Sequence, residues 1–211
     1  ITNATTPVIA VVAAMAQELA ALVAAARAEG PVRTEAVLGR ELLHGTLGGA
    51  PVVLARSGVG KVAAAATAAV LAQRVGAIIM VGTAGGLGEG VQVGDTVVAT
   101  AFLQHDMDTS PLFPRHEMPG YGLSRFPTHP EWQQSLSAAA QRTVTRLAAT
   151  VGADVVNRFG LHAARVHQGL VISGDRFVAT GAESDALRQQ LPDALAVEME
   201  GAAVAQVCHD H

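Results

Sequence analysis

The sequence predicts an α/β fold with a largely parallel or mixed central sheet. Short apolar runs typical of buried strands alternate with alanine-rich stretches typical of helices along the 211 residues. Glycines stand at several ends of these stretches, where helices stop and turns form. No internal repeat or domain linker interrupts the alternation, so we expect a single domain over residues 1–211.

The chain is expected to begin with a strand, a helix and a hairpin. Residues 7–15 are a continuous apolar run, which indicates a buried strand. Residues 16–30 follow as an alanine-rich helix that Gly30 closes. Residues 41–58 predict a β-hairpin, with the Gly48–Gly49 pair near its turn.

The middle of the chain continues the alternation and then breaks it. Residues 61–76 predict a helix ended by Gly76, and residues 77–88 predict a buried strand that runs into a glycine-rich loop. Another strand is expected at 92–104. Residues 111–130 hold five of the nine prolines, so they predict a long irregular loop of the kind that is often functional.

The last third returns to helices and strands. Helices are expected at 133–152, 182–191 and 201–211, because each stretch is rich in alanine and other helix formers. Apolar runs at 164–174 and 194–199 predict two further strands.

Composition excludes several classes of protein. Half of the residues are hydrophobic but only 3% are aromatic, so the core must consist of closely packed small aliphatic side chains. A net charge of −4 without a Lys/Arg cluster argues against a nucleic-acid partner. No uncharged apolar run reaches membrane-spanning length. The single cysteine, Cys208, fits a reducing compartment and a cytoplasmic location, although the numbering starts at Ile1 and a removed signal peptide stays open.

Two glycine-rich stretches resemble phosphate-binding loops but lack required residues. Around Gly60 and Lys61, the positions that a P-loop fills with glycine and Ser/Thr hold Ala55 and Val62. The stretch GTAGGLGEG lacks the spacing of a dinucleotide-binding loop, and a strand follows it where a helix is needed. What remains for its glycines is a tight turn or a close backbone approach to a ligand.

Seven motifs in order identify a family. They are VVAAMAQELAAL, SGVGKVAAA, VGTAGGLG, VGDTVVA, QHDMD, VISGDRFV and AVEMEGAAVAQVCH. Together they closely resemble the bacterial 5'-methylthioadenosine/S-adenosylhomocysteine nucleosidases of the nucleoside phosphorylase superfamily, from about Val8 to His211. The resemblance implies a three-layer α/β/α fold with a central mixed twisted sheet, and a homodimer. It also implies hydrolysis of the adenine–ribose bond of methylthioadenosine and/or S-adenosylhomocysteine, which releases adenine and a thioribose without a cofactor.

Two carboxylates stand in the otherwise almost wholly apolar run 195–208. Glu198 and Glu200 would share one face if both were extended, because strand side chains alternate. In the family that the chain resembles, the residue at Glu200 binds the ribose hydroxyls, and its charge can stabilise the cationic sugar. Met199 would pack against the sugar or the sulfur substituent, and Glu198 would support the site. Solvated carboxylates at a strand end are the alternative.

Glu18 is the second expected catalytic residue. Taken alone, it would be a solvent-facing helix residue, but the match to AM-x-x-E implies the general base that acts on the attacking water. A phosphorylase needs cationic groups to hold a phosphate dianion, and residues 14–18 contain no arginine. We therefore predict hydrolysis rather than phosphorolysis.

The other expected substrate contacts follow from the same resemblance. Phe177 would stack on adenine, with plain core packing as its alternative, and Val178 would read the adenine edge through its backbone. Asp175 is expected to hold that loop. The remaining contacts are Met15, Val59, Thr83, Ala84 and Gly85.

The proline-rich loop and the histidines complete the expected site. The resemblance implies that the loop reaches the partner subunit's pocket for the 5' substituent, and Leu112, Phe113, Met118 and Pro119 would serve there. The stretches HDMD (105–108) and CHDH (208–211) contain metal-ligand residue types without a recognised zinc spacing, so no metal is expected.

The family pattern continues past the helix at 201–211 into a strand whose aspartate protonates the purine. We therefore expect that the numbered chain lacks a C-terminal strand and helix of its domain. Two alternatives stay open: phosphorolysis or hydrolysis of a related purine nucleoside such as an aminofutalosine derivative, and a non-catalytic nucleoside-binding homologue.

Overall fold

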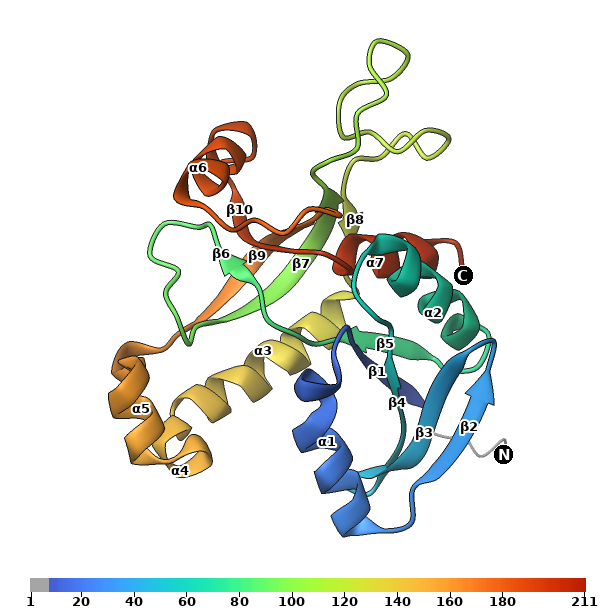
Figure 1. Cartoon of the computed structure of the whole chain (residues 1–211), viewed down its shortest axis with the longest axis vertical. Helices are drawn as coiled ribbons and strands as arrows, with labels where there is room; N and C mark the ends of the chain where they lie inside the picture. Colours follow the sequence, from blue (N-terminus) through green and yellow to red (C-terminus); the bar gives the residue numbers. More distant parts are fainter. Residues whose placement is uncertain (1–7) are drawn as a thin grey trace. The chain divides into compact units, whose positions relative to one another are not determined.

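A computed structural model describes residues 8–211, and these residues divide into two compact units. Unit 1 comprises Ile1–Thr83 and Met199–His211, and unit 2 comprises Ala84–Glu198. Figure 1 labels the elements of both units. The first residue of the strand expected at 7–15 lies outside the described residues. Among residues 8–211, no helix is long and apolar enough to cross a membrane.

Unit 1 contains a mixed five-stranded sheet with the order β2-β3-β4-β1-β5. Its central strand β1 pairs in parallel with β4 and β5, whereas β2, β3 and β4 pair antiparallel. The strands are β1 (Ile9–Ala13), β2 (Arg33–Val37), β3 (Arg40–Leu47), β4 (Ala50–Arg56) and β5 (Ala77–Met80). The helices of this unit are α1 (Ala16–Glu29), α2 (Lys61–Ala72) and α7 (Gly201–His209).

Helices cover both faces of the unit 1 sheet. Side chains alternate along β1, so Ala10 and Val12 share a cluster with Leu71 of α2, while Val11 shares another with Ala26 of α1. The opposite faces of β1 therefore face different helices, and unit 1 has the three-layer α/β/α arrangement that the sequence predicts (Figure 1).

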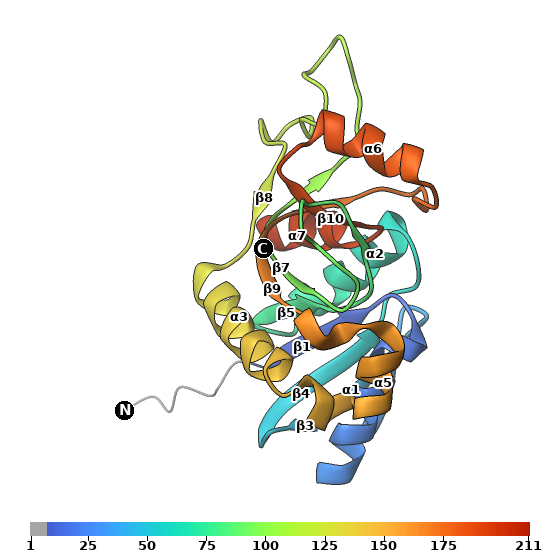
Figure 2. The same ribbon diagram turned by 90° about the vertical axis from the view of Figure 1, so that its left-hand side faces the viewer.

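Small side chains let two helices of unit 1 pack closely. Ala64 and Ala68 of α2 form one buried cluster with Ala203 and Val204 of α7, and Met80 of β5 packs against it. The two helices lie side by side in both views (Figures 1 and 2). This packing is the core of small aliphatic residues that the composition predicts.

Unit 2 contains the second mixed sheet, with the order β6-β10-β9-β7-β8. The three inner strands run parallel, and β6 and β8 pair antiparallel at the edges. The strands are β6 (Gly85–Gly86), β7 (Thr96–Gln104), β8 (Phe126–Pro127), β9 (Val166–Ser173) and β10 (Ala194–Glu198). The helices are α3 (Pro130–Val144), α4 (Leu147–Val151), α5 (Ala153–Phe159), α6 (Gly181–Gln190) and the 3₁₀ helix η1 (Leu161–Ala163). Leu187 of α6 joins Leu170 and Ile172 of β9 in the main core of this unit.

Hydrogen bonds of Asp95 hold the start of two unit 2 strands. Asp95, just before β7, accepts hydrogen bonds from the backbone N–H groups of Gln92 and Arg165, and its Oδ2 lies 2.7 Å from His167 Nε2. Burial alone would raise the pKa of Asp95, but these hydrogen bonds outweigh it and lower the pKa. Asp95 thus ties β7 to the neighbouring strand β9.

Most predicted elements are confirmed, and the differences have local causes. The hairpin turns at Gly48 and Gly49, which have φ of 59° and 78°. The helix expected at 61–76 stops at Ala72, because the chain turns and the Gly76 N–H bonds to the Val8 carbonyl just before β1. The strand expected at the start of 77–88 is β5, and the glycine-rich stretch that follows it contains the two-residue strand β6.

The helix expected at 133–152 begins earlier and is interrupted. Pro130 occupies its first turn, where the missing N–H costs nothing, so α3 starts there. α3 ends at Val144, where the hydroxyls of Thr143 and Thr145 bond back to carbonyls of the preceding turn and compete with the helix ladder. Strand β2 and helix α5 were not predicted. β2 is a largely exposed edge strand without an apolar pattern.

Candidate active site

Glu18 lies in the first turn of α1, and three donors fix its carboxylate. Oε2 accepts from the Met15 backbone N–H at 3.0 Å. Oε1 accepts from the Thr83 N–H at 2.9 Å and from the Thr83 hydroxyl at 3.1 Å. A Cβ atom at Gly82 would lie 3.0 Å from Oε1, so a larger residue there would press on the Glu18 carboxylate. The structure thus brings Thr83 to Met15 and Glu18, although Thr83 lies 65 positions after Glu18 in the sequence.

Met15 and Val59 line one cavity of about 420 Å³ in unit 1. The cavity is formed by the start of α1, the tip of the β2–β3 hairpin and the end of β4. Its charged lining residues are Arg40 and Arg56. The absence of arginine from residues 14–18 therefore does not mean that cations are absent around Met15.

Glu200 is buried, with 6% of its surface exposed. Its Oε1 accepts a hydrogen bond of 2.6 Å from the Gly60 backbone N–H, directly before α2. Gly60 has φ of 96°, a conformation that favours glycine. The carboxylate is therefore held beside Val59 by a glycine-rich turn, and the alternative of a solvated Glu200 is excluded.

Glu198 and Glu200 are not both extended, so the condition under which they would share one face is not met. β10 ends at Glu198, and Glu200 precedes α7 with φ of −135° and ψ of −41°, so strand alternation does not apply across Met199. Glu198 belongs to unit 2, where its Oε1 accepts a hydrogen bond from the Ser173 hydroxyl at the end of β9. Glu200 and the half-buried Met199 belong to unit 1.

Ala84 and Gly85 open unit 2. Gly85 pairs with Val197 of β10, and a side chain at Gly85 would come within 3.2 Å of Val197 Cγ1. Gly85 therefore lies close to β10, and its approach to a ligand stays a prediction. Both residues are exposed.

Phe177 and Val178 lie in the turn between β9 and α6. Phe177 is 76% exposed, so the alternative of plain core packing is wrong for its ring. Val178 is partly buried and packs against the main core of unit 2. Asp175 donates its backbone N–H to Asp106 Oδ2 at 2.9 Å, which holds the start of this turn.

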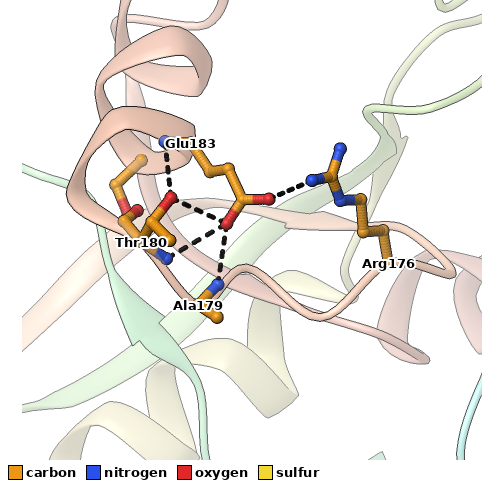
Figure 3. Close-up of polar contacts among 5 residues, drawn as sticks. Arg176, Ala179, Thr180 and Glu183 are labelled. Carbon is orange, nitrogen blue, oxygen red and sulfur yellow. Dashed lines mark hydrogen bonds and ion pairs between the residues drawn. The ribbon is translucent and has the colours of Figure 1, made fainter.

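A capping box secures the other end of the turn. Glu183 Oε2 accepts from the N–H groups of Ala179 and Thr180 and from the Thr180 hydroxyl, while Thr180 Oγ1 accepts from the Glu183 N–H (Figure 3). Arg176 pairs with Glu183 Oε1. The Thr180 hydroxyl, the two backbone N–H groups and the Arg176 charge lower the pKa of Glu183 against the effect of desolvation. Phe177 and Val178 are therefore presented by a turn that is fastened at both ends.

The proline-rich loop exposes part of its apolar surface. Leu112 is 83% exposed, Phe113 is 38% exposed, and Pro119 is exposed as well. Met118 is only 7% exposed and its backbone forms a bridge with Leu123, so the expected contact of this residue with a partner subunit stays a prediction.

The two aspartates of HDMD accept hydrogen bonds from backbone N–H groups of loops. Asp106 binds the Asp175 N–H, and Asp108 accepts from the Ser110 N–H. The Ser110 hydroxyl and N–H lower the pKa of Asp108. Within residues 8–211, no group of three or more His, Cys, Asp or Glu side chains gathers as a metal site would require.

Four features of this region were missed in the sequence. Arg40 and Arg56 stand in separate motifs, and only the fold brings them to one cavity. Ser173 is an ordinary strand residue until its partner Glu198 is known. The spacing of Thr180 and Glu183 is a capping-box signature that could have been recognised.

Comparison with known proteins assigns the family. Residues 8–211 match the phosphorylase superfamily. The 5'-methylthioadenosine/S-adenosylhomocysteine nucleosidase of Anoxybacillus flavithermus is 36% identical over 204 residues, which cover 95% of this chain and 78% of the relative.

Solved structures of such nucleosidases share the fold. The Neisseria meningitidis enzyme in complex with methylthio-immucillin-A superimposes with a TM-score of 0.78 at 33% identity, over 96% of this chain and 80% of that one. The Colwellia psychrerythraea enzyme in complex with adenine superimposes with a TM-score of 0.81 at 29% identity, over 98% of this chain and 78% of that one. The chain therefore belongs to the phosphorylase superfamily and, within it, to the family of 5'-methylthioadenosine/S-adenosylhomocysteine nucleosidases.

Proposed function

We propose that the protein hydrolyses the N-glycosidic bond of 5'-methylthioadenosine and/or S-adenosylhomocysteine, releasing adenine and a thioribose. The observation that carries the proposal is the Glu18 carboxylate, which three hydrogen bonds hold in one place beside the Thr83 hydroxyl. A fixed carboxylate can accept a proton from water, which is the task of a general base. Family membership supplies the substrate class.

The remaining roles are those that the family resemblance implies. Glu18 takes a proton from water as the water oxygen bonds to the anomeric carbon and the C1'–N9 bond breaks, while Thr83 orients the water. The electron pair of the broken bond goes to adenine, which takes up a proton and leaves as the neutral base. Glu200 accepts hydrogen bonds from the ribose hydroxyls, and its negative charge favours the cationic sugar that forms as the bond breaks. Glu198 supports this region from the end of β10, and Met199 packs against the sugar.

Adenine and the 5' substituent would be bound by apolar and backbone groups. The exposed ring of Phe177 is available to stack on the purine, and Val178 offers backbone groups to its edge. Ala84 and Gly85 lie along the ligand, Met15 contacts it, and Val59 lies on its sugar side. No cofactor enters this reaction, which consumes one water.

The proposal includes a symmetric homodimer in the cytoplasm. Exposed Leu112, Phe113 and Pro119 would reach the partner's pocket, because an exposed apolar loop favours a contact surface. Changing Leu112 and Phe113 together to aspartate should weaken both self-association and thioether binding. Sedimentation and substrate kinetics test this, and a fully active monomer would contradict it.

Product analysis of the full-length natural protein tests the activity. Methylthioadenosine, S-adenosylhomocysteine, an aminofutalosine derivative and adenosine are each incubated with and without phosphate. Adenine and a free thioribose, independent of phosphate, support the proposal. Formation of a sugar phosphate would identify a phosphorylase, and preferred turnover of another nucleoside would change the substrate. Binding without adenine release would identify a non-catalytic homologue.

A further inference from the structure

The cavity lined by Arg40 and Arg56 carries positive charge that has no role in the proposed reaction. These two guanidinium groups are its charged lining residues, and no carboxylate lines it. The chain as a whole carries a net charge of −4, so this concentration of positive charge is local. An uncharged methylthio group would gain nothing from it.

The two arginines have hydrogen-bonding capacity to spare. Within residues 8–211, the Arg56 side chain makes no hydrogen bond or ion pair, and it is exposed at the end of β4. Arg40 donates Nε to the Thr67 hydroxyl at 2.9 Å and Nη1 to the Leu38 carbonyl at 3.2 Å. These bonds orient the Arg40 guanidinium, while its Nη2 makes no hydrogen bond in the described part of the chain. An arginine held in this way matches the planar geometry of a carboxylate or phosphate.

The turn between β2 and β3 places Arg40 at this cavity. Leu38 and Gly39 both have positive φ, 48° and 76°, and they form the turn that leads into β3. Arg40 follows at the first position of β3, and Gly39 lines the cavity with it. Leu38 is a non-glycine residue in a left-handed conformation, which is uncommon. The chain thus adopts an unfavourable backbone at the point where Arg40 enters the cavity.

We propose that this cavity is an oxyanion subsite that receives the carboxylate of the amino-acid tail of S-adenosylhomocysteine. The inference rests on the proposed function, in which Met15 contacts the substrate and Val59 lies on its sugar side, since the same two residues line the cavity. The homocysteine tail is attached through sulfur to the 5' carbon of that sugar and ends in a carboxylate. In methylthioadenosine a methyl group ends the substituent, so the arginines have nothing to bind. A second source of the same chemistry is inorganic phosphate, and the experiment separates the two.

The test compares both substrates in full-length wild-type protein and in Arg56→Gln. Arg56 is preferred to Arg40, because Arg56 has no internal hydrogen bond whose loss would disturb the fold. We expect kcat/KM for S-adenosylhomocysteine to fall about tenfold, as for loss of one charge-assisted hydrogen bond, while that for methylthioadenosine changes less than about twofold. Arg56→Lys should recover part of the loss, since it keeps the charge without the planar fork.

Arg33→Gln is the matched control, because Arg33 is an exposed arginine of the same unit and does not line the cavity. This variant should leave kcat/KM unchanged for both substrates. Titration with phosphate forms the second arm. The oxyanion subsite is supported if phosphate competes with S-adenosylhomocysteine in the wild type but not in Arg56→Gln.

The outcomes separate the ideas. The subsite is overturned if Arg56→Gln lowers kcat/KM equally for both substrates. It is also overturned if kcat/KM falls for neither substrate and phosphate does not compete. Unchanged substrate preference together with Arg56-dependent phosphate binding overturns the carboxylate as its ligand and assigns phosphate instead. Wild-type turnover of methylthioadenosine tests the proposed function separately, since that substrate does not require the arginines.

Discussion

Replacing Glu18 by glutamine keeps the shape of the side chain and removes the base. Oε1 accepts two hydrogen bonds from Thr83, and Oε2 accepts one from the Met15 N–H. The amide oxygen of glutamine can keep the Thr83 pair, but its NH₂ group then faces the Met15 N–H, donor against donor. One hydrogen bond to a charged acceptor is lost, which costs about 1–2 kcal/mol of folding free energy.

This loss is small compared with the expected loss of activity. For a chain of this size, 1 kcal/mol lowers Tm by about 2–4 °C, so the variant stays folded at assay temperature. Without a general base, kcat should fall by about a hundredfold or more. Affinity for a non-hydrolysable adenine nucleoside should stay within a few fold, because Glu18 acts on the water rather than on the base.

Glu29 of the same helix provides a matched control. Its two carboxylate oxygens accept from the N–H groups of Gly48 and Gly49 at 2.7 and 3.2 Å. Glu29→Gln should therefore cost comparable stability and leave turnover unchanged. Adenine release and thermal unfolding are measured for both variants. Near-normal turnover in Glu18→Gln, or an equal loss in Glu29→Gln, would refute the role of Glu18 as the base.

Three further predictions concern other residues. Glu200→Gln should lower kcat together with kcat/KM in steady-state assays, because it removes the charge opposite the cationic sugar; a rise in KM alone would make Glu200 a uniform binder. Thr180→Ala should lower the unfolding free energy in urea by about 1 kcal/mol through loss of the N-cap and raise KM by loosening Phe177, whereas Thr180→Ser should do neither. Asp95 has a lowered pKa in the folded state, so its contribution to stability is present above about pH 4 and is lost as pH falls through the folded value. Urea unfolding between pH 3 and 7 should show a flatter acid dependence in Asp95→Asn, and equal slopes would contradict this.

The sequence by itself determined the α/β class, most of the elements and the family. Apolar runs and alanine-rich stretches depend on local periodicity, which a sequence displays directly. The hairpin turn at Gly48 and Gly49 was predictable for the same reason, because the conformation of a turn depends on the residues within it. The family motifs likewise pointed to Glu18 and Glu200 before any contact was known.

Only the tertiary structure decided what those residues contact. The Glu18 carboxylate is fixed by Thr83, 65 positions away, and Glu200 by Gly60, 140 positions away. β10 ends at Glu198 and Glu200 precedes α7, so Glu200 does not have strand geometry. The same folding brought Arg40 and Arg56 to Met15, where the local sequence contains no arginine. Contacts of this kind arise from the pairing of distant strands, and no local pattern records which distant strand ends meet.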